Sequence, residues 1–496
     1  MKLKKSILLT VLLIYTFTAF SQFLVFSNYL PYNQKTDVHP ITSNPEMGLP
    51  IIFMSGKEIR IFYLADECKF QKEILIKRPA HNSKKYLGGY INDSSLILTF
   101  SDKQFSSISQ IIVNLNTGIL FELSVEINSG NQIYLTSWET KSGLVVLGIV
   151  ENSNVITVSK FSGYGDISSH KYNSDFNEII QNHESYTLSG LFDSQGGAIQ
   201  KIDASIPVSL YLASAKNKAY LINEEIIITI DYFSGITYYL AINLLQNTHK
   251  LQSYPCDIDN HLAKSNSFIY DNTLFQLSVD KDELSLNIIG LTDTNRIVKY
   301  YAPKTEKIGF SNSSMEQRNE KEGFLYGKPD ITDIKKTKRF LKIVSKMKPA
   351  ISVFRKKEDF QILLGGVAEI HQAAGVASKP ILASGGEMTV GTSGNLIMPE
   401  PVYHFPTNYS FSSYSSRKSA YLSSIINSSS FQHMSKSISK YTYNYIIDYT
   451  NYMPDNQGLV TIFKMSGDYY LGYYLYGSNT YNLEWFKNID DYSIQY

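Results

Sequence analysis

The stretch IIVNLNTGILFEL, residues 111–123, decides the fold class of this chain. In it an apolar run meets a polar turn at Gly118, and a shorter apolar run follows. This is the pattern of two antiparallel strands joined by a tight turn. The pattern recurs three times, with turns centred on Gly165, Thr248 and Asn295. The three recurrences are ITVSKFSGYGDISSH (156–170), LAINLLQNTHKLQSY (240–254) and LNIIGLTDTNRIVKY (286–300).

The four turns lie 47, 83 and 47 residues apart. A propeller blade of four strands takes roughly 40–50 residues, so the shorter spacing fits one blade. The longer spacing fits two smaller units, or one unit plus an excursion around residues 175–206. Other short β-branched and aromatic runs between residues 23 and 303 are separated by Asn, Asp, Ser and Gly turns. We therefore expect an all-β fold with one helical insertion, a β-propeller of six or seven four-stranded blades. Tandem β-sandwich modules are the alternative.

The overall composition excludes several classes of protein. Of 496 residues, 46 are Lys or Arg and 45 are Asp or Glu, and 43% are hydrophobic, which is enough apolar material for a large core. Two cysteines, Cys68 and Cys256, cannot form a disulfide framework, and we expect both to be unpaired. The near-neutral charge also excludes a general nucleic-acid binder.

The N-terminus has the three parts of an export signal. Lys2, Lys4 and Lys5 precede an apolar run that ends at Phe20, and small residues lie three and one positions before Gln22. The run is short for a membrane-spanning helix, and no later stretch reaches 18 apolar residues. We expect cleavage after Ser21, and a periplasmic, outer-membrane-surface or extracellular location. The ending Ala-Phe-Ser-Gln and the composition rich in Ile, Lys, Asn and Tyr resemble exported proteins of Bacteroidetes-type bacteria.

The pattern divides the mature chain into four parts. Propeller blades are expected over 22–326, a basic amphipathic helix plus a β-hairpin over 327–366, a Gly/Ser-rich insertion over 367–440, and a Tyr-rich closing blade over 441–496. The helix is predicted over Asp330–Lys348, because apolar residues recur there at helical spacing and Pro349 follows. The strand at Phe23–Phe26 is expected to complete the last blade.

Two sets of residues are candidate binding surfaces. The basic block between Lys335 and Lys357 has no acidic residue and would suit an anionic glycan, a lipopolysaccharide or an envelope protein. The alternative is a solvated helix face whose side-chain stems cover apolar surface. The candidate residues for anion binding are Lys335, Lys336, Lys338, Arg339, Lys342, Lys346, Arg355, Lys356 and Lys357.

The second set is a group of tyrosines in the closing blade, which could form an aromatic surface. Its members are Tyr469, Tyr470, Tyr473, Tyr474 and Tyr476. The alternative is that these tyrosines pack within strands.

No catalytic or metal-binding signature appears in the chain. There is no HExxH, EF-hand loop, GxSxG or Walker A motif, and the nearest candidate for a ligand pair is Glu369 with His371. We therefore expect neither a metal nor a cofactor, and no catalytic residue can be named. The expected function is an exported, non-catalytic binding or scaffold protein. The alternative is a secreted polysaccharide hydrolase or lyase with its site in the propeller funnel.

Overall fold

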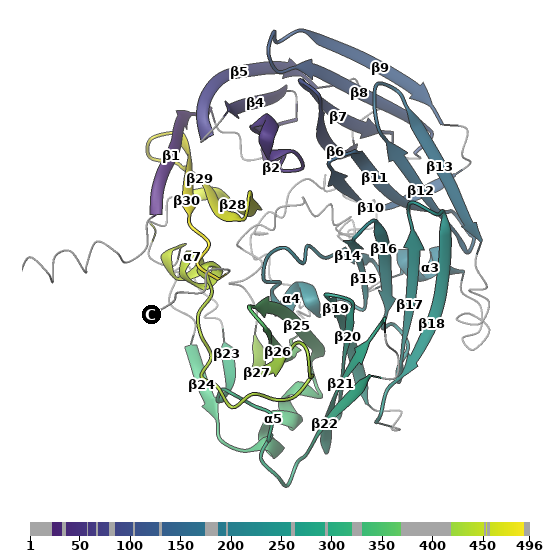
Figure 1. Ribbon diagram of the computed structural model, residues 1–496, viewed down its shortest axis with the longest axis vertical. Helices are drawn as coiled ribbons and strands as arrows, with labels where there is room; N and C mark the ends of the chain where they lie inside the picture. The colour runs from purple at the N-terminus through teal and green to yellow at the C-terminus, as the bar shows by residue number, and fades with distance from the viewer. Residues whose placement is uncertain are drawn as a thin grey trace, which may run out of the picture.

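The computed structural model describes residues 22–31, 36–56, 58–65, 68–78, 85–102, 105–127, 131–173, 187–194, 197–258, 263–292, 296–319, 330–368, 418–450, 453 and 457–490. Within these ranges the strands form seven sheets, which surround a common axis (Figure 1). The expected β-propeller is confirmed, with seven blades, and the chain does not form tandem sandwich modules.

Blades 1 to 3 are regular, and their strands follow the chain from one edge of the sheet to the other. Blade 1 consists of β2 (Asp37–Pro40), β3 (Leu49–Met54), β4 (Glu58–Ala65) and β5 (Lys69–Lys77), with a 3-10 turn η1 (Pro45–Met47) before β3. Blade 2 consists of β6 (Lys85–Asn92), β7 (Ser95–Ser101), β8 (Ser107–Asn114) and β9 (Leu120–Glu126). Blade 3 consists of β10 (Gln132–Thr140), β11 (Gly143–Val150), β12 (Val155–Phe161) and β13 (Ile167–Asn173).

Blade 4 has an additional inner strand. The short helix α3 (Leu188–Asp193) leads into β14 (Ile199–Lys201), and α4 (Leu210–Ala213) follows it. β14 pairs in parallel with β15, and the remaining strands are antiparallel. They are β15 (Asn217–Ile222), β16 (Glu225–Ile230), β17 (Ile236–Asn243) and β18 (Thr248–Pro255). The spacing of 83 residues between the turns at Gly165 and Thr248 therefore contains one blade plus an excursion, which is one of the two arrangements predicted for it.

Blade 5 is regular again, whereas blade 6 is assembled out of chain order. Blade 5 consists of β19 (Lys264–Tyr270), β20 (Thr273–Val279), β21 (Glu283–Gly290) and β22 (Ile297–Pro303). Blade 6 has the order β24-β23-β27-β26-β25, so the first hairpin in the chain lies outermost. Its strands are β23 (Met315–Asn319), β24 (Asp330–Ile334), β25 (Lys348–Lys356), β26 (Asp359–Val367) and β27 (Ser419–Asn427).

The helix in blade 6 is shorter than predicted. α5 spans Thr337–Val344, and the predicted helical residues Asp330–Ile334 form strand β24 instead. The physical reason is that this segment pairs along its whole length with β23, and backbone hydrogen bonding to a neighbouring strand outweighs its helical pattern. The predicted apolar face is otherwise correct, because Phe340, Leu341 and Val344 are fully buried. None of the helices in the described ranges is long and apolar enough to cross a membrane.

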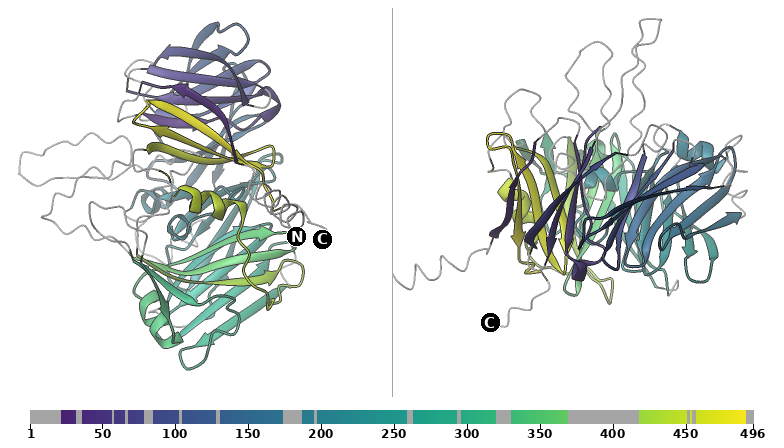
Figure 2. Two further views of the ribbon diagram at one scale, coloured as in Figure 1. Left: turned by 90° about the vertical axis from the view of Figure 1, so that its left-hand side faces the viewer. Right: turned by 90° about the horizontal axis from the view of Figure 1, so that it is seen from above.

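Blade 7 joins the two ends of the chain. Helix α7 (Thr442–Thr450) precedes β28 (Gln457–Met465), β29 (Asp468–Leu475) and β30 (Thr480–Phe486). The outermost strand is β1 (Gln22–Tyr29), which pairs antiparallel with β30. Figure 2 shows the purple N-terminal strand against the yellow C-terminal blade. The prediction that the N-terminal strand completes the last blade is confirmed.

The core is a ring of apolar clusters between neighbouring blades. Middle strands such as β7 and β11 are buried along almost their whole length, whereas the outer strands β9 and β13 alternate or are exposed. Each cluster contains residues of adjacent blades. Examples are Ile61 with Leu98, Tyr90 with Val146, Leu147 with Ile228, Tyr220 with Phe268, Phe275 with Phe360, Phe354 with Tyr469, and Tyr481 with Phe53. The last of these lies between blades 7 and 1 and closes the ring.

Candidate active site at the propeller axis

The inner edge of each blade faces the axis, and polar side chains gather at one end of it. The inner strands are β2, β6, β10, β14, β19, β25 and β28 (Figure 1). Inner strands of a propeller are where charged side chains from separate blades can meet in a confined space, as in other concave binding sites. Blades 2, 3 and 4 supply such a group here.

Glu139 is the central residue of this group. It lies near the end of β10, and its carboxylate accepts a hydrogen bond from the backbone N–H of Gly89 in β6, at 3.3 Å. Burial raises the pKa of Glu139 to about 7, against the opposing effects of the Lys201 charge and the Gly89 hydrogen bond. A Cβ at the Gly89 position would meet the ends of neighbouring side chains, with Leu98 Cδ2 at 2.9 Å and the Tyr86 hydroxyl at 3.0 Å, so a larger residue there would displace side chains of this group.

Lys201 is the second member of the group and ends β14, the extra inner strand of blade 4. Its side chain is only 7% exposed, and burial lowers its pKa to about 8, although the charges of Glu139 and Asp203 raise it. The ammonium lies 5.9 Å from the centre of the Trp138 ring. A carboxyl and an ammonium, held in a poorly solvated place, thus have proton affinities close to neutral pH.

Aromatic and basic residues of blades 2 and 3 surround this pair. The Lys85 ammonium lies 3.9 Å from the centre of the Tyr134 ring, and burial lowers the pKa of Lys85 to about 7. Burial and the nearby Glu139 charge raise the pKa of Tyr86 well above its ordinary value. Within the described part of the chain, the Tyr86 hydroxyl and the Trp138 Nε1 are buried without a hydrogen-bond partner.

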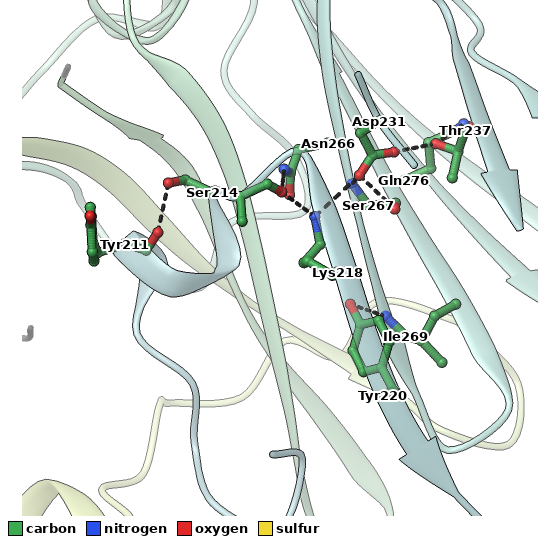
Figure 3. Close-up of polar contacts among 11 residues, drawn as sticks. Tyr211, Ser214, Lys218, Tyr220, Asp231, Thr237, Asn266, Ser267, Ile269 and Gln276 are labelled. Atoms are coloured by element: carbon green, nitrogen blue, oxygen red, sulfur yellow. Dashed lines mark hydrogen bonds and ion pairs between the residues drawn. The ribbon is translucent and has the colours of Figure 1, made fainter. Parts of the chain in front are cut away.

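A second buried pair, Lys218 and Asp231, has a different character. Neither side chain is exposed, and the Lys218 Nζ lies 3.2 Å from Asp231 Oδ2 (Figure 3). The Asp231 carboxylate also accepts from the Ser267 backbone N–H and hydroxyl, each at 2.8 Å, and from the Thr237 hydroxyl at 2.7 Å. Because all of these donors come from the protein, the carboxylate is already fully coordinated. This pair joins blade 4 to β19 of blade 5 and is structural.

The predicted anion-binding residues lie in two separate places. Those on or beside α5 pack with blade 6, where the Lys338 charge also lowers the pKa of Asp282 in blade 5, after the larger effect of Lys304. Arg355, Lys356 and Lys357 instead lie at the end of β25, on the inner edge of blade 6. Whether either set binds an anion stays a prediction. Glu369 and His371 lie outside the described residues.

The five tyrosines do not form an exposed aromatic surface. Tyr469, Tyr470, Tyr473 and Tyr474 are buried, and Tyr476 is 44% exposed. The four buried rings alternate between the two faces of β29, and both faces pack, so these rings fill the interfaces of blade 7 with α7 and blade 1. Cys68 and Cys256 are both free, as expected.

Sequence reasoning missed the axial group. Glu139 and Lys201 are 62 positions apart and belong to no spacing motif. Each lies near the end of a strand where a charged residue is ordinarily exposed. Glu139 and Lys201 lie near each other because blades 3 and 4 are neighbours and because β14 is an added inner strand, and neither feature can be read from the sequence.

Comparisons with known proteins give a likeness to solved structures alone. No protein family and no curated protein sequence matches the chain. Cobalt-substituted Synechocystis ACO matches with a TM-score of 0.29 and 8% identity, over 55% of this chain and 63% of that chain. A single-site mutant of Synechocystis apocarotenoid oxygenase matches with a TM-score of 0.31 and 9% identity, over 56% of this chain and 64% of that chain. The chain thus spans less than two thirds of either structure.

The expectation of a non-catalytic binding or scaffold protein is not upheld, since the solved structures that match are of an apocarotenoid oxygenase and its chimeras, which are enzymes. Their substrates and metal are not transferred to this chain at this level of likeness. In the described residues no three His, Cys, Asp or Glu side chains are grouped so that they could hold a metal ion.

Proposed function

We propose that this chain is an enzyme in which Glu139 and Lys201 act as general base and general acid on a substrate bound at the propeller axis. The observation that carries the proposal is their position: a buried carboxyl on β10 and a buried ammonium on β14, inner strands of adjacent blades, lie near enough for each charge to affect the pKa of the other. Among the described residues Glu139 receives one hydrogen bond, from Gly89, whereas the structural carboxylate of Asp231 receives four. Glu139 therefore retains the capacity to accept a proton from a substrate.

The two proton affinities suit chemistry near neutral pH. With a pKa of about 7, Glu139 is ionised on the alkaline side of that value and can remove a proton. With a pKa of about 8, Lys201 keeps its proton on the acid side of that value and can donate it. Catalysis that needs the carboxylate and the ammonium together therefore has a bell-shaped pH profile with its optimum near neutral pH. The Tyr86 hydroxyl and the Trp138 Nε1 can orient the substrate.

The proposal is tested by comparing the mature chain with Glu139→Gln, which preserves shape but cannot accept the proton. Both proteins are incubated with a small-molecule extract at pH 6–9, and consumed compounds are followed by mass spectrometry. We expect the wild type to consume a compound fastest between pH 7 and 8 and Glu139→Gln to be roughly 10²–10⁴-fold slower. Lys201→Met should lose the alkaline limb of the profile together with most of the rate.

A carboxyl titration gives an independent readout. With ¹³C-labelled glutamate, one carboxyl of the wild type should titrate near pH 7, and its signal should be absent from Glu139→Gln. Equal turnover by the two proteins, no turnover by either, or a Glu139 carboxyl that titrates near 4.5 would each refute the proposed role.

We also propose that the protein is exported after removal of residues 1–21. The tripartite N-terminal pattern supports this. β1 begins at Gln22, so cleavage after Ser21 leaves the closing strand of blade 7 whole. Mass spectrometry of the chain recovered from envelope and extracellular fractions should find Gln22 at its N-terminus. A chain that retains Met1 in the cytoplasm would contradict the proposal.

A further inference from the structure

A cavity of about 340 Å³ includes residues 204 and 205, a few positions after Lys201, in its wall. Its walls come from inner strands: Tyr270 ends β19, Phe354 and Arg355 lie near the end of β25, and Lys464 lies near the end of β28. Lys357 lies in the turn that follows β25, and residues 204 and 205 follow β14. The cavity is thus formed by residues of blades 5 to 7 and by the segment that follows β14 of blade 4, and Glu139 is not among the residues that line it.

The lining of the cavity is strongly cationic. Arg355, Lys357 and Lys464 contribute to its wall, and the described lining residues include no acidic side chain, although Asp271 pairs with Arg355 from outside the lining. An anion placed among these cations is attracted by their combined charge. The volume is at the lower end of the range for small-molecule sites, roughly 300–1,000 Å³.

The cationic side chains are positioned by the fold. The Arg355 guanidinium is held by Asp271 at 2.6 Å, and its Nε donates to the carbonyl oxygen of Lys357 at 2.8 Å. Lys356, between them in sequence, is directed elsewhere: its ammonium lies 3.5 Å from Asp490 and donates to the Lys440 carbonyl oxygen. Lys356 thus has a structural partner, whereas Arg355 at the end of β25 and Lys357 in the following turn line the cavity.

Two aromatic rings supply an apolar wall. The Tyr270 and Phe354 ring centres lie 6.0 Å apart in an edge-to-face arrangement. A ligand that matches this cavity has an anionic group for the three cations and an apolar or ring portion for the aromatic wall. A bare inorganic ion would leave that wall uncovered.

We propose that this cavity binds the anionic group of a small organic acid, a carboxylate or a phosphate monoester, and so holds the substrate of the acid–base pair. This assignment of substrate class rests on the proposed function. Ala204 on the cavity wall is three positions after Lys201, a span of roughly 11 Å at most. A substrate with its anion in the cavity can therefore present another group to Lys201 and Glu139.

The test uses the mature chain at low salt, with phenyl phosphate and benzoate as probes and benzyl alcohol as their neutral match. Binding is measured by calorimetry. The pocket variant is Lys357→Ala with Lys464→Ala. The matched control is Lys338→Ala with Lys342→Ala, which removes the same charge from the exposed face of α5. All three proteins are first shown to have the same thermal midpoint.

We expect the wild type and the α5 control to bind at least one anionic probe, more weakly as salt is added, and not to bind benzyl alcohol. The pocket variant should bind at least tenfold more weakly. Binding of the pocket variant within twofold of wild type, equal loss in the α5 control, or no anion binding by the wild type would overturn the proposal.

The two proposals can fail separately. Glu139→Gln should bind phenyl phosphate as the wild type does, because Glu139 does not line the cavity. Normal turnover in the pocket variant with an anionic substrate would refute the anion site and leave the acid–base pair intact. Normal turnover in Glu139→Gln would refute the pair, whereas the probe measurement would still decide whether the cavity binds anions.

Discussion

At the scale of single residues, burial separates a structural ion pair from a surface one. Lys218 and Asp231 have no exposed side-chain surface, whereas the pair between Lys299 and Asp257, at 2.5 Å, has side chains that are 58% and 29% exposed. Removing one partner of a buried pair leaves the other charge without water or a counter-ion. A solvated pair leaves no such charge behind.

Asp231→Ala is therefore expected to lower the free energy of unfolding by about 3–5 kcal/mol. Asp257→Ala, the matched control, should cost less than about 1 kcal/mol. Urea unfolding at constant pH measures both. A double variant, Lys218→Met with Asp231→Leu, should regain part of the loss, because it leaves neither charge buried. If Asp231→Ala were as stable as Asp257→Ala, the interpretation of this pair as a joint between blades 4 and 5 would be incorrect.

Residue identity alone did not predict which charged side chains meet. The basic block between Lys335 and Lys357 is contiguous in sequence, but the structure divides it between α5 and the axial end of β25. The partners of its axial part, Lys464 and Tyr270, lie far away along the chain. Conversely, the tyrosines of β29 look like a surface cluster only until both faces of that strand are seen to be covered.

At the scale of secondary structure, hairpins were predictable because they are local. Turn residues, such as Gly118 and Gly165 with their positive φ angles, and the period of two in the strands are both encoded within about fifteen residues. Blade 6 was not predictable in the same way. Its hairpin β23–β24 pairs with β27, about one hundred residues further along the chain, and no local pattern specifies that pairing. The predicted start of the helix is instead strand β24, because it pairs with β23 within this hairpin.

At the scale of the whole molecule, the seven blades form one closed ring of apolar contacts, and β1 makes the closure. Phe26 of β1 is 6% exposed, and its ring centre lies 5.5 Å from that of Phe62 in blade 1. Leu24, two positions earlier in the same strand, is 59% exposed. β1 thus contains a buried residue that packs at the junction between blades 7 and 1, Phe26, and an exposed residue that does not, Leu24.

Phe26→Ala should cost about 3–5 kcal/mol of unfolding free energy, and Leu24→Ala roughly 0.5 kcal/mol or less. If the ring of blades unfolds as one cooperative unit, Phe26→Ala also speeds hydrogen exchange in β16 of blade 4, on the far side of the axis. The increase in the exchange rate should equal the change in the unfolding equilibrium constant that corresponds to the lost free energy. Hydrogen exchange measured by mass spectrometry on peptides from β16 and β30 distinguishes cooperative unfolding of the whole ring from local fraying of β1. Faster exchange confined to β1 and β30 would show that the closing strand frays locally and that the remaining blades are stable without it.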